Sequence, residues 1–174
     1  MVPHFAKSLE DFKGFSTINA QAETLMNKAL WRIPFQRRRC LVPADGFYEW
    51  RKLDAKTKQP YAFGMKSGEP FAFAGVWDGW KDPSTGIWLQ SYAIITTTPN
   101  QLAATVHNRM PVILKPSDYD RWLLREHFER PPLDLLRPYD AAEMSAHMVD
   151  PKVGNVRNDG PGLCTPWECP PNSA

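Results

Sequence analysis

Short runs of aromatic and aliphatic residues alternate with polar turns between residues 40 and 97. The runs are rich in β-branched and aromatic side chains and have the length of single strands, at residues 40–43, 47–52, 60–65, 71–77 and 88–97. Lysine, aspartate and glycine separate them, as in Lys66-Ser67-Gly68 and in the segment 82–86. The pattern predicts a meander of antiparallel strands.

Helical patterns are short and lie outside this meander. Residues 22–30 have the composition of a short helix. Ser117, three residues before Asp120, resembles the capping box that begins a helix. Prolines flank residues 133–136, which limits that segment to a turn or two of helix. Further strands are predicted at residues 110–114 and 144–149, and a further short helix at residues 99–106.

Together these elements predict the α+β class, with a twisted, barrel-like antiparallel β-sheet and a few short peripheral helices. The length of 174 residues and the hydrophobic content of 43% suit one domain with a core of its own. We place this domain at residues 1–162. The proline-rich segment 163–174 is expected to be a disordered tail.

The net charge and the cysteine content limit the binding partners and the cellular compartment that can be expected for the protein. The net charge of +2 is too small to indicate a nucleic-acid binder that works by charge alone. The run Arg37-Arg38-Arg39 follows Trp31 and Phe35, which fits either a platform for single-stranded nucleic acid or a charged strand edge. Three cysteines without an apolar leader indicate the reducing cytoplasm. No apolar run is long enough to span a membrane.

Asn19, Glu49 and His107 are the candidate catalytic residues. A carboxylate and an imidazole can donate and accept protons near neutral pH, and a neutral amide orients a substrate without titrating. Such a set suits proton transfer at a carbonyl, imine or hemiaminal, but it contains no nucleophile of its own. The alternative interpretation is structural, with Glu49 as a strand-end carboxylate beside Arg51 and His107 as a turn residue.

Cys40 is the alternative nucleophile, which with His107 and Asn19 would form a Cys-His-Asn hydrolase. Cys40 begins an apolar strand, and free cysteines are commonly buried, so we interpret it as a core residue. No metal site is predicted, because the histidines are scattered and Cys164 and Cys169 lack a second pair of ligands. No cofactor is expected.

Three strings of residues carry a resemblance to a known family. Residues 18–24 read Ile-Asn-Ala-Gln-Ala-Glu-Thr, residues 45–50 read Asp-Gly-Phe-Tyr-Glu-Trp, and residues 107–114 read His-Asn-Arg-Met-Pro-Val-Ile-Leu. In this order and spacing they resemble the SOS response-associated peptidase (SRAP) family, from Pro3 to about Gly162. The resemblance implies the SRAP-like fold and a protein that binds single-stranded DNA and links covalently to its abasic sites.

The resemblance implies a reaction at the family's amino terminus. Self-processing removes the initiator methionine and exposes a cysteine, whose amine and thiol close a thiazolidine ring on the aldehyde of the open abasic sugar. In this chain Met1 is followed by Val2. We therefore expect the chain to lack the family's amino-terminal segment and to be inactive in crosslinking. The alternatives are a non-catalytic single-stranded DNA-binding module and a small cytoplasmic hydrolase that uses Cys40.

Site roles are also implied by position in the family pattern. Asn19 is implied to orient the terminal amine or the sugar, and Glu49 to act as general acid and base. His107 is implied to move a proton at the sugar hydroxyl. Arg109 is implied to bind the phosphate beside the lesion.

The remaining DNA-binding positions depart from the family pattern or are less specific. Gln21 stands where relatives carry an arginine, which removes one phosphate contact. Phe5 stands where a tryptophan wedge is usual, and it offers a smaller stacking face. Arg157, with Asn155, matches a motif near the carboxyl terminus, and we include Arg157 among the DNA-binding candidates.

Overall fold

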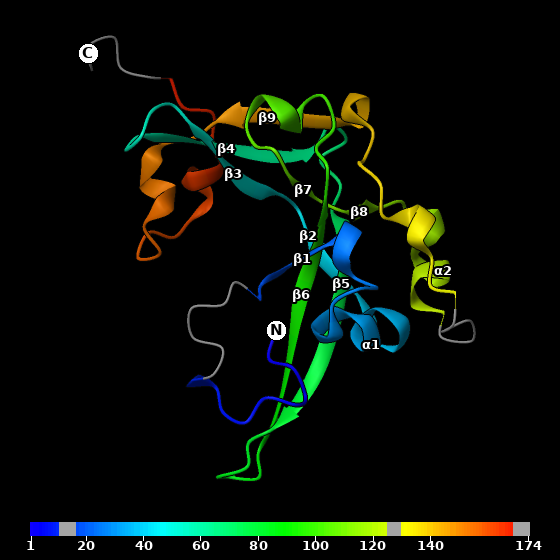
Figure 1. Ribbon diagram of the computed structural model, residues 1–174. Helices are drawn as coiled ribbons and strands as arrows, with labels where there is room; N and C mark the ends of the chain where they lie inside the picture. The colour runs from blue at the N-terminus through cyan, green and yellow to red at the C-terminus, as the bar shows by residue number, and fades with distance from the viewer. Residues whose placement is uncertain (11–16, 125–129, 169–174) are drawn as a thin grey trace. The chain divides into compact units, whose positions relative to one another are not determined.

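The computed structural model describes residues 1–10, 17–124 and 130–168 of the chain (Figure 1). The chain divides into two compact units, which are treated separately below. Unit 1 comprises Met1–Pro43, Phe71–Thr98 and Met110–Tyr139. Unit 2 comprises Ala44–Pro70, Pro99–Arg109 and Asp140–Ala174.

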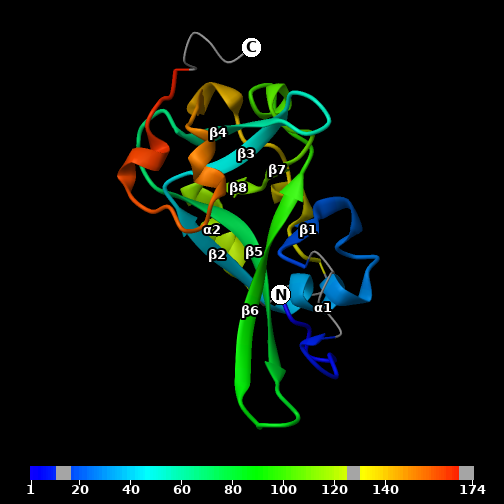
Figure 2. The same cartoon turned by 90° about the vertical axis from the view of Figure 1, so that its left-hand side faces the viewer.

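Unit 1 is built on a six-stranded mixed sheet that forms a half-barrel. Its strands are β1 (Asn19–Gln21), β2 (Arg39–Ala44), β5 (Phe71–Lys81), β6 (Trp88–Thr97), β7 (Met110–Pro111) and β8 (Ile113–Leu114). The order is β1-β6-β5-β2, with β7 added to β6 and β8 added to β5. The strands β5 and β6 form a long antiparallel hairpin (Figure 2), whereas β1 runs parallel to β6.

Helix α1 (Ala29–Arg37) begins later than the sequence pattern predicts. The predicted helix at residues 22–30 is wrong, because only a 3₁₀ turn forms at Ala22–Thr24 and Lys28 is extended. Packing decides the position: Trp31 and Phe35, one helical turn apart, are both buried in the core of unit 1. The second helix, α2 (Tyr119–Leu123), follows a 3₁₀ turn at Pro116–Asp118 and buries Trp122 in the same core.

Unit 2 contains a three-stranded antiparallel sheet in the order β3-β4-β9. Its strands are β3 (Phe47–Lys52), β4 (Lys58–Met65) and β9 (Met144–Met148), and Phe47 stacks on Phe63 across the first pair. Short 3₁₀ turns surround the sheet, at Ala103–Thr105, Ala141–Glu143, Pro151–Gly154 and Pro161–Cys164. The Trp167 N–H donates to the Met148 carbonyl at 3.0 Å.

The α+β class, the sheet-dominated architecture and the shortness of the helices are confirmed. The predicted strands at residues 47–52 and 88–97 have the observed bounds, and the predicted strand at 144–149 is β9. Two features differ from the prediction. The strands form two sheets rather than one, and β1 pairs with β6 in parallel because it joins the sheet from outside the meander.

Gly75 of β5 leaves space that neighbouring side chains fill. A Cβ atom at this position would lie 2.8 Å from Cys40 Sγ and 2.9 Å from Val42 Cγ2. We expect Gly75→Ala to lower the free energy of unfolding by about 1–3 kcal/mol, the usual effect of overpacking. Gly79→Ala on the same strand is the matched control, since its Cβ would lie at an ordinary 3.6 Å from the Trp88 ring. Urea denaturation compares the two; equal stabilities would contradict the prediction.

Candidate functional site

Glu49 and His107 face each other within unit 2. Glu49 lies in β3, opposite Tyr61 of β4. His107 follows the 3₁₀ turn at Ala103–Thr105, and its N–H donates to the Ala103 carbonyl at 2.9 Å. The two side chains approach to 3.9 Å between His107 Nδ1 and Glu49 Oε2. They are 41% and 24% exposed, so a ligand can reach both groups.

Burial raises the pKa of Glu49 above its ordinary value. The positive charge of His107 and the Trp50 N–H act in the opposite direction, but their effect is smaller. The Glu49 carboxyl therefore keeps its proton to a higher pH than an exposed glutamate does. The pair combines an acid with an imidazole, which are the two partners that proton exchange with a bound substrate needs.

The loop after His107 fixes the imidazole from one side. His107 Nδ1 lies 3.2 Å from the main-chain N of Arg109 and 3.2 Å from its carbonyl oxygen. This loop brings the main chain of Arg109 next to the His107 imidazole.

The other predicted residues lie at the surface of one unit or the other. In unit 1, Asn19 and Gln21 are exposed on one face of β1, on either side of the buried Ala20. Phe5, also in unit 1, is 53% exposed. Arg157, in unit 2, is exposed, and its N–H donates to Asn155 Oδ1 at 3.1 Å. Within unit 2 the structure thus brings together the side chains of Glu49 and His107, with the main chain of Arg109 beside the imidazole.

Cys40 lies in β2 and is half-buried. Burial raises the pKa of its thiol to about 11, so the thiol is protonated at neutral pH. This supports the interpretation of Cys40 as a packing residue rather than a nucleophile.

Among the described residues, no three histidine, cysteine, aspartate or glutamate side chains lie together as metal ligands. None of the helices in that part of the chain is long and apolar enough to cross a membrane.

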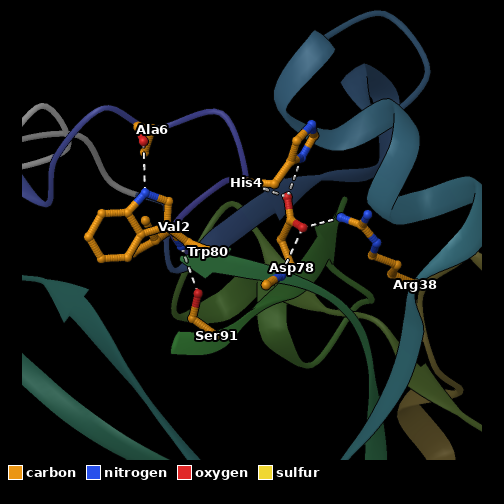
Figure 3. A network of polar contacts seen from close by, with 8 residues as sticks. Val2, His4, Ala6, Arg38, Asp78, Trp80 and Ser91 are labelled. Carbon is orange, nitrogen blue, oxygen red and sulfur yellow. Dashed lines mark hydrogen bonds and ion pairs between the residues drawn. The ribbon is translucent and has the colours of Figure 1, made fainter. Parts of the chain in front are cut away.

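A buried polar network in unit 1 was not predicted from the sequence. Asp78 of β5 is fully buried, and its carboxylate accepts from the His4 main-chain N–H, His4 Nδ1, the Gly79 N–H and the Arg38 guanidinium (Figure 3). Nearby, Trp80 Nε1 donates to the Ala6 carbonyl at 2.7 Å. The available signal was an aspartate inside the apolar run 71–80, because a buried carboxylate requires donors from elsewhere in the fold.

Comparisons with other proteins identify relatives that extend over most of the chain. It matches the family described as SOS response associated peptidase (SRAP) over residues 1–156. It is 43% identical to the abasic site processing protein YoqW of Bacillus subtilis, over 94% of this chain and 72% of that protein. It is 32% identical to the abasic site processing protein HMCES of Gallus gallus, over 97% of this chain and 56% of that protein.

Two crystal structures share the fold. A protein from Bacteroides thetaiotaomicron superposes with a TM-score of 0.88 at 31% identity, over 97% of this chain and 74% of that one. A protein from Bordetella bronchiseptica gives a TM-score of 0.75 at 28% identity, over 86% of this chain and 74% of that one. On the extent of these matches, the chain belongs to the SOS response associated peptidase family.

Proposed function

We propose that this chain binds single-stranded DNA that contains abasic sites. The observation that carries the proposal is the Glu49–His107 pair, at 3.9 Å and with a raised Glu49 pKa, in a family whose relatives are named abasic site processing proteins. An abasic sugar in its open form presents an aldehyde. Attack of an amine on this aldehyde gives a hemiaminal and then an imine, and each step moves a proton.

The pair suits both of these proton transfers. In its protonated form Glu49 donates to the hydroxyl that leaves the hemiaminal as water. His107 accepts a proton from the amine or the sugar hydroxyl. Arg109 holds the phosphate beside the lesion.

Covalent capture in the family requires an amine and a thiol on adjacent carbons, which only an amino-terminal cysteine supplies. The cysteines of the 174 residues are Cys40, Cys164 and Cys169, and each has its amine in a peptide bond. These cysteines cannot close a thiazolidine ring. We therefore propose that none of these three cysteines captures an abasic site through this chemistry.

The remaining contacts are of the kind that single strands require. Phe5 offers an exposed ring for stacking on an unpaired base, and Arg157 offers an exposed cation for a phosphate. Gln21 contributes a neutral hydrogen bond where relatives place a cation. Binding is therefore weaker than in relatives that carry an arginine at this position.

We expect the chain to bind single-stranded oligonucleotides more tightly than duplexes of the same length. Stacking needs unpaired base faces, and each phosphate contact adds about 0.7 to the slope of log affinity against log salt on a single strand. Fluorescence anisotropy over a range of salt concentrations measures both quantities, with and without an abasic site in the strand. Equal affinity for single-stranded and duplex DNA, or no dependence on salt, would contradict the proposed function.

A further inference from the structure

His4 is held in a fixed orientation at the surface of unit 1. Its main-chain N–H and its Nδ1 atom both lie 2.9 Å from Asp78 Oδ2 (Figure 3). The Asp78 side chain is 1% exposed, whereas the His4 side chain is 47% exposed. One edge of the imidazole is thus anchored to a buried carboxylate. Its opposite edge, with Nε2, has no hydrogen-bond partner among the described residues.

Asp78 is itself held rigidly by other groups. Its Oδ1 atom accepts from the Gly79 N–H at 2.8 Å and from the Arg38 guanidinium. Arg38 is held in turn by a cation–π contact, with its Cζ atom 5.9 Å from the centroid of the Trp77 ring. A buried aspartate that accepts the Nδ1 proton fixes the tautomer and the direction of a histidine, so that Nε2 faces outward.

The charges around His4 favour an anion at its exposed edge. Asp78, from β5, and Arg38, from the end of α1, compensate each other. Ser91 of β6 pairs with Asp78 of β5; its side chain is neutral, and its Oγ atom accepts from the Val2 main-chain N–H. Protonation of His4 therefore gives the group a net charge of +1, with the Nε2–H of the imidazolium as an outward donor.

Phe5 is the immediate neighbour of this donor. The two rings meet edge to face, with centroids 5.3 Å apart. Phe5 is 53% exposed and offers a stacking surface. An aromatic face beside a cationic donor matches the alternation of base and phosphate along a single DNA strand.

We propose that His4, oriented by Asp78, forms a phosphate-binding subsite next to the base that stacks on Phe5. The inference rests on the proposed function, because it needs a single-stranded DNA in the site. Phosphate binding requires the protonated imidazole, because a neutral ring that donates its Nδ1–H to Asp78 presents only a lone pair at Nε2. Asp78 acts as a positioning residue and does not touch the DNA.

His4→Gln tests the subsite in the full chain, because residue 4 is exposed and its N–H still donates to Asp78. At pH 6 we expect the variant to bind single-stranded DNA about 3- to 10-fold more weakly, as expected for loss of one charge-assisted bond. We also expect its salt slope to be shallower by about 0.7, which is one phosphate contact. At pH 8 the difference between the variant and the wild type should be smaller, because only the protonated imidazole donates from Nε2.

His147→Gln is the matched control, because His147 directs Nε2 to the Cys164 carbonyl at 2.7 Å and its replacement should leave the affinity unchanged. Circular dichroism at both pH values verifies that the variants are folded. If His4→Gln binds at pH 6 with the affinity and the salt slope of the wild type, His4 does not form a phosphate-binding subsite. That result would not contradict the proposed function. A wild-type chain that does not bind single-stranded DNA at either pH would overturn both.

Discussion

Replacing Glu49 with glutamine is expected to slow covalent capture of an abasic site by about 100- to 10,000-fold, the range for loss of a positioned acid or base. The test uses a version of the chain extended at its amino terminus so that a family-type cysteine follows the initiator methionine. Glutamine keeps the shape and the hydrogen bonds of Glu49 but cannot release or take up a proton. Imine formation then loses its proton donor while the DNA still binds.

The pH dependence of the capture rate distinguishes two effects of Glu49→Gln: loss of the proton donor, and a change in the structure of the site. Burial raises the pKa of Glu49, so the donor is present below that raised pKa and is lost as the pH rises through it. The wild-type rate should therefore fall on the alkaline side, and the Glu49→Gln profile should lack this fall. A rate loss with an unchanged profile would show that Glu49 does not act as the acid.

His107→Gln should lower the rate of the same reaction by a similar factor, because it removes the second member of the pair. Denaturing gels of timed reactions with an abasic oligonucleotide measure all rates. Glu69→Gln is the control, since Glu69 is exposed and lies in the same unit. Capture at the wild-type rate by both Glu49→Gln and His107→Gln would exclude the pair from the chemistry.

The strands between Arg39 and Thr97 could be predicted because each one overlaps a run of aromatic and aliphatic residues in the sequence. The observed bounds of β3 and β6 are those of the aromatic and aliphatic runs in the sequence. Helix α1 could not be placed in this way. Residues 22–30 have good helix composition, but Trp31 and Phe35 lie one helical turn apart and are both buried in the core. Tertiary packing therefore favours a helix that lies closer to the carboxyl terminus than composition indicates.

The candidate site was predictable only in part, and for a similar reason. Glu49 and His107 could be named as acid and base from residue type and from the family pattern. Their distance of 3.9 Å depends on a contact between residues 58 positions apart, which composition does not encode. The His4–Asp78 contact joins residues 74 positions apart, and neither residue stands in a motif. Buried polar networks of this kind become visible only when the sheet is folded.

Among the described residues of unit 1, Arg39 is buried like Asp78, and its guanidinium donates hydrogen bonds to main-chain carbonyls. Nη1 donates to the carbonyls of Phe35 and Gln36, both at 2.9 Å, near the end of α1. Nε donates to the Trp122 carbonyl at 2.6 Å, and Nη2 donates to the Leu124 carbonyl. One guanidinium thus satisfies the last turn of α1 and the end of α2 together, and its charge complements the negative end of the α1 dipole.

Replacing Arg39 with methionine is expected to lower the free energy of unfolding by about 3–5 kcal/mol, because the apolar side chain leaves buried carbonyls without donors. Arg39→Lys should recover only part of this loss, since one ammonium cannot reach carbonyls on both sides of the site. Arg32→Met, at an exposed position of α1, is the control and should change stability by less than about 0.5 kcal/mol. Urea denaturation at constant m-value measures all three. Equal stability of the Arg39→Met and Arg32→Met variants would show that Arg39 does not hold the two helices together.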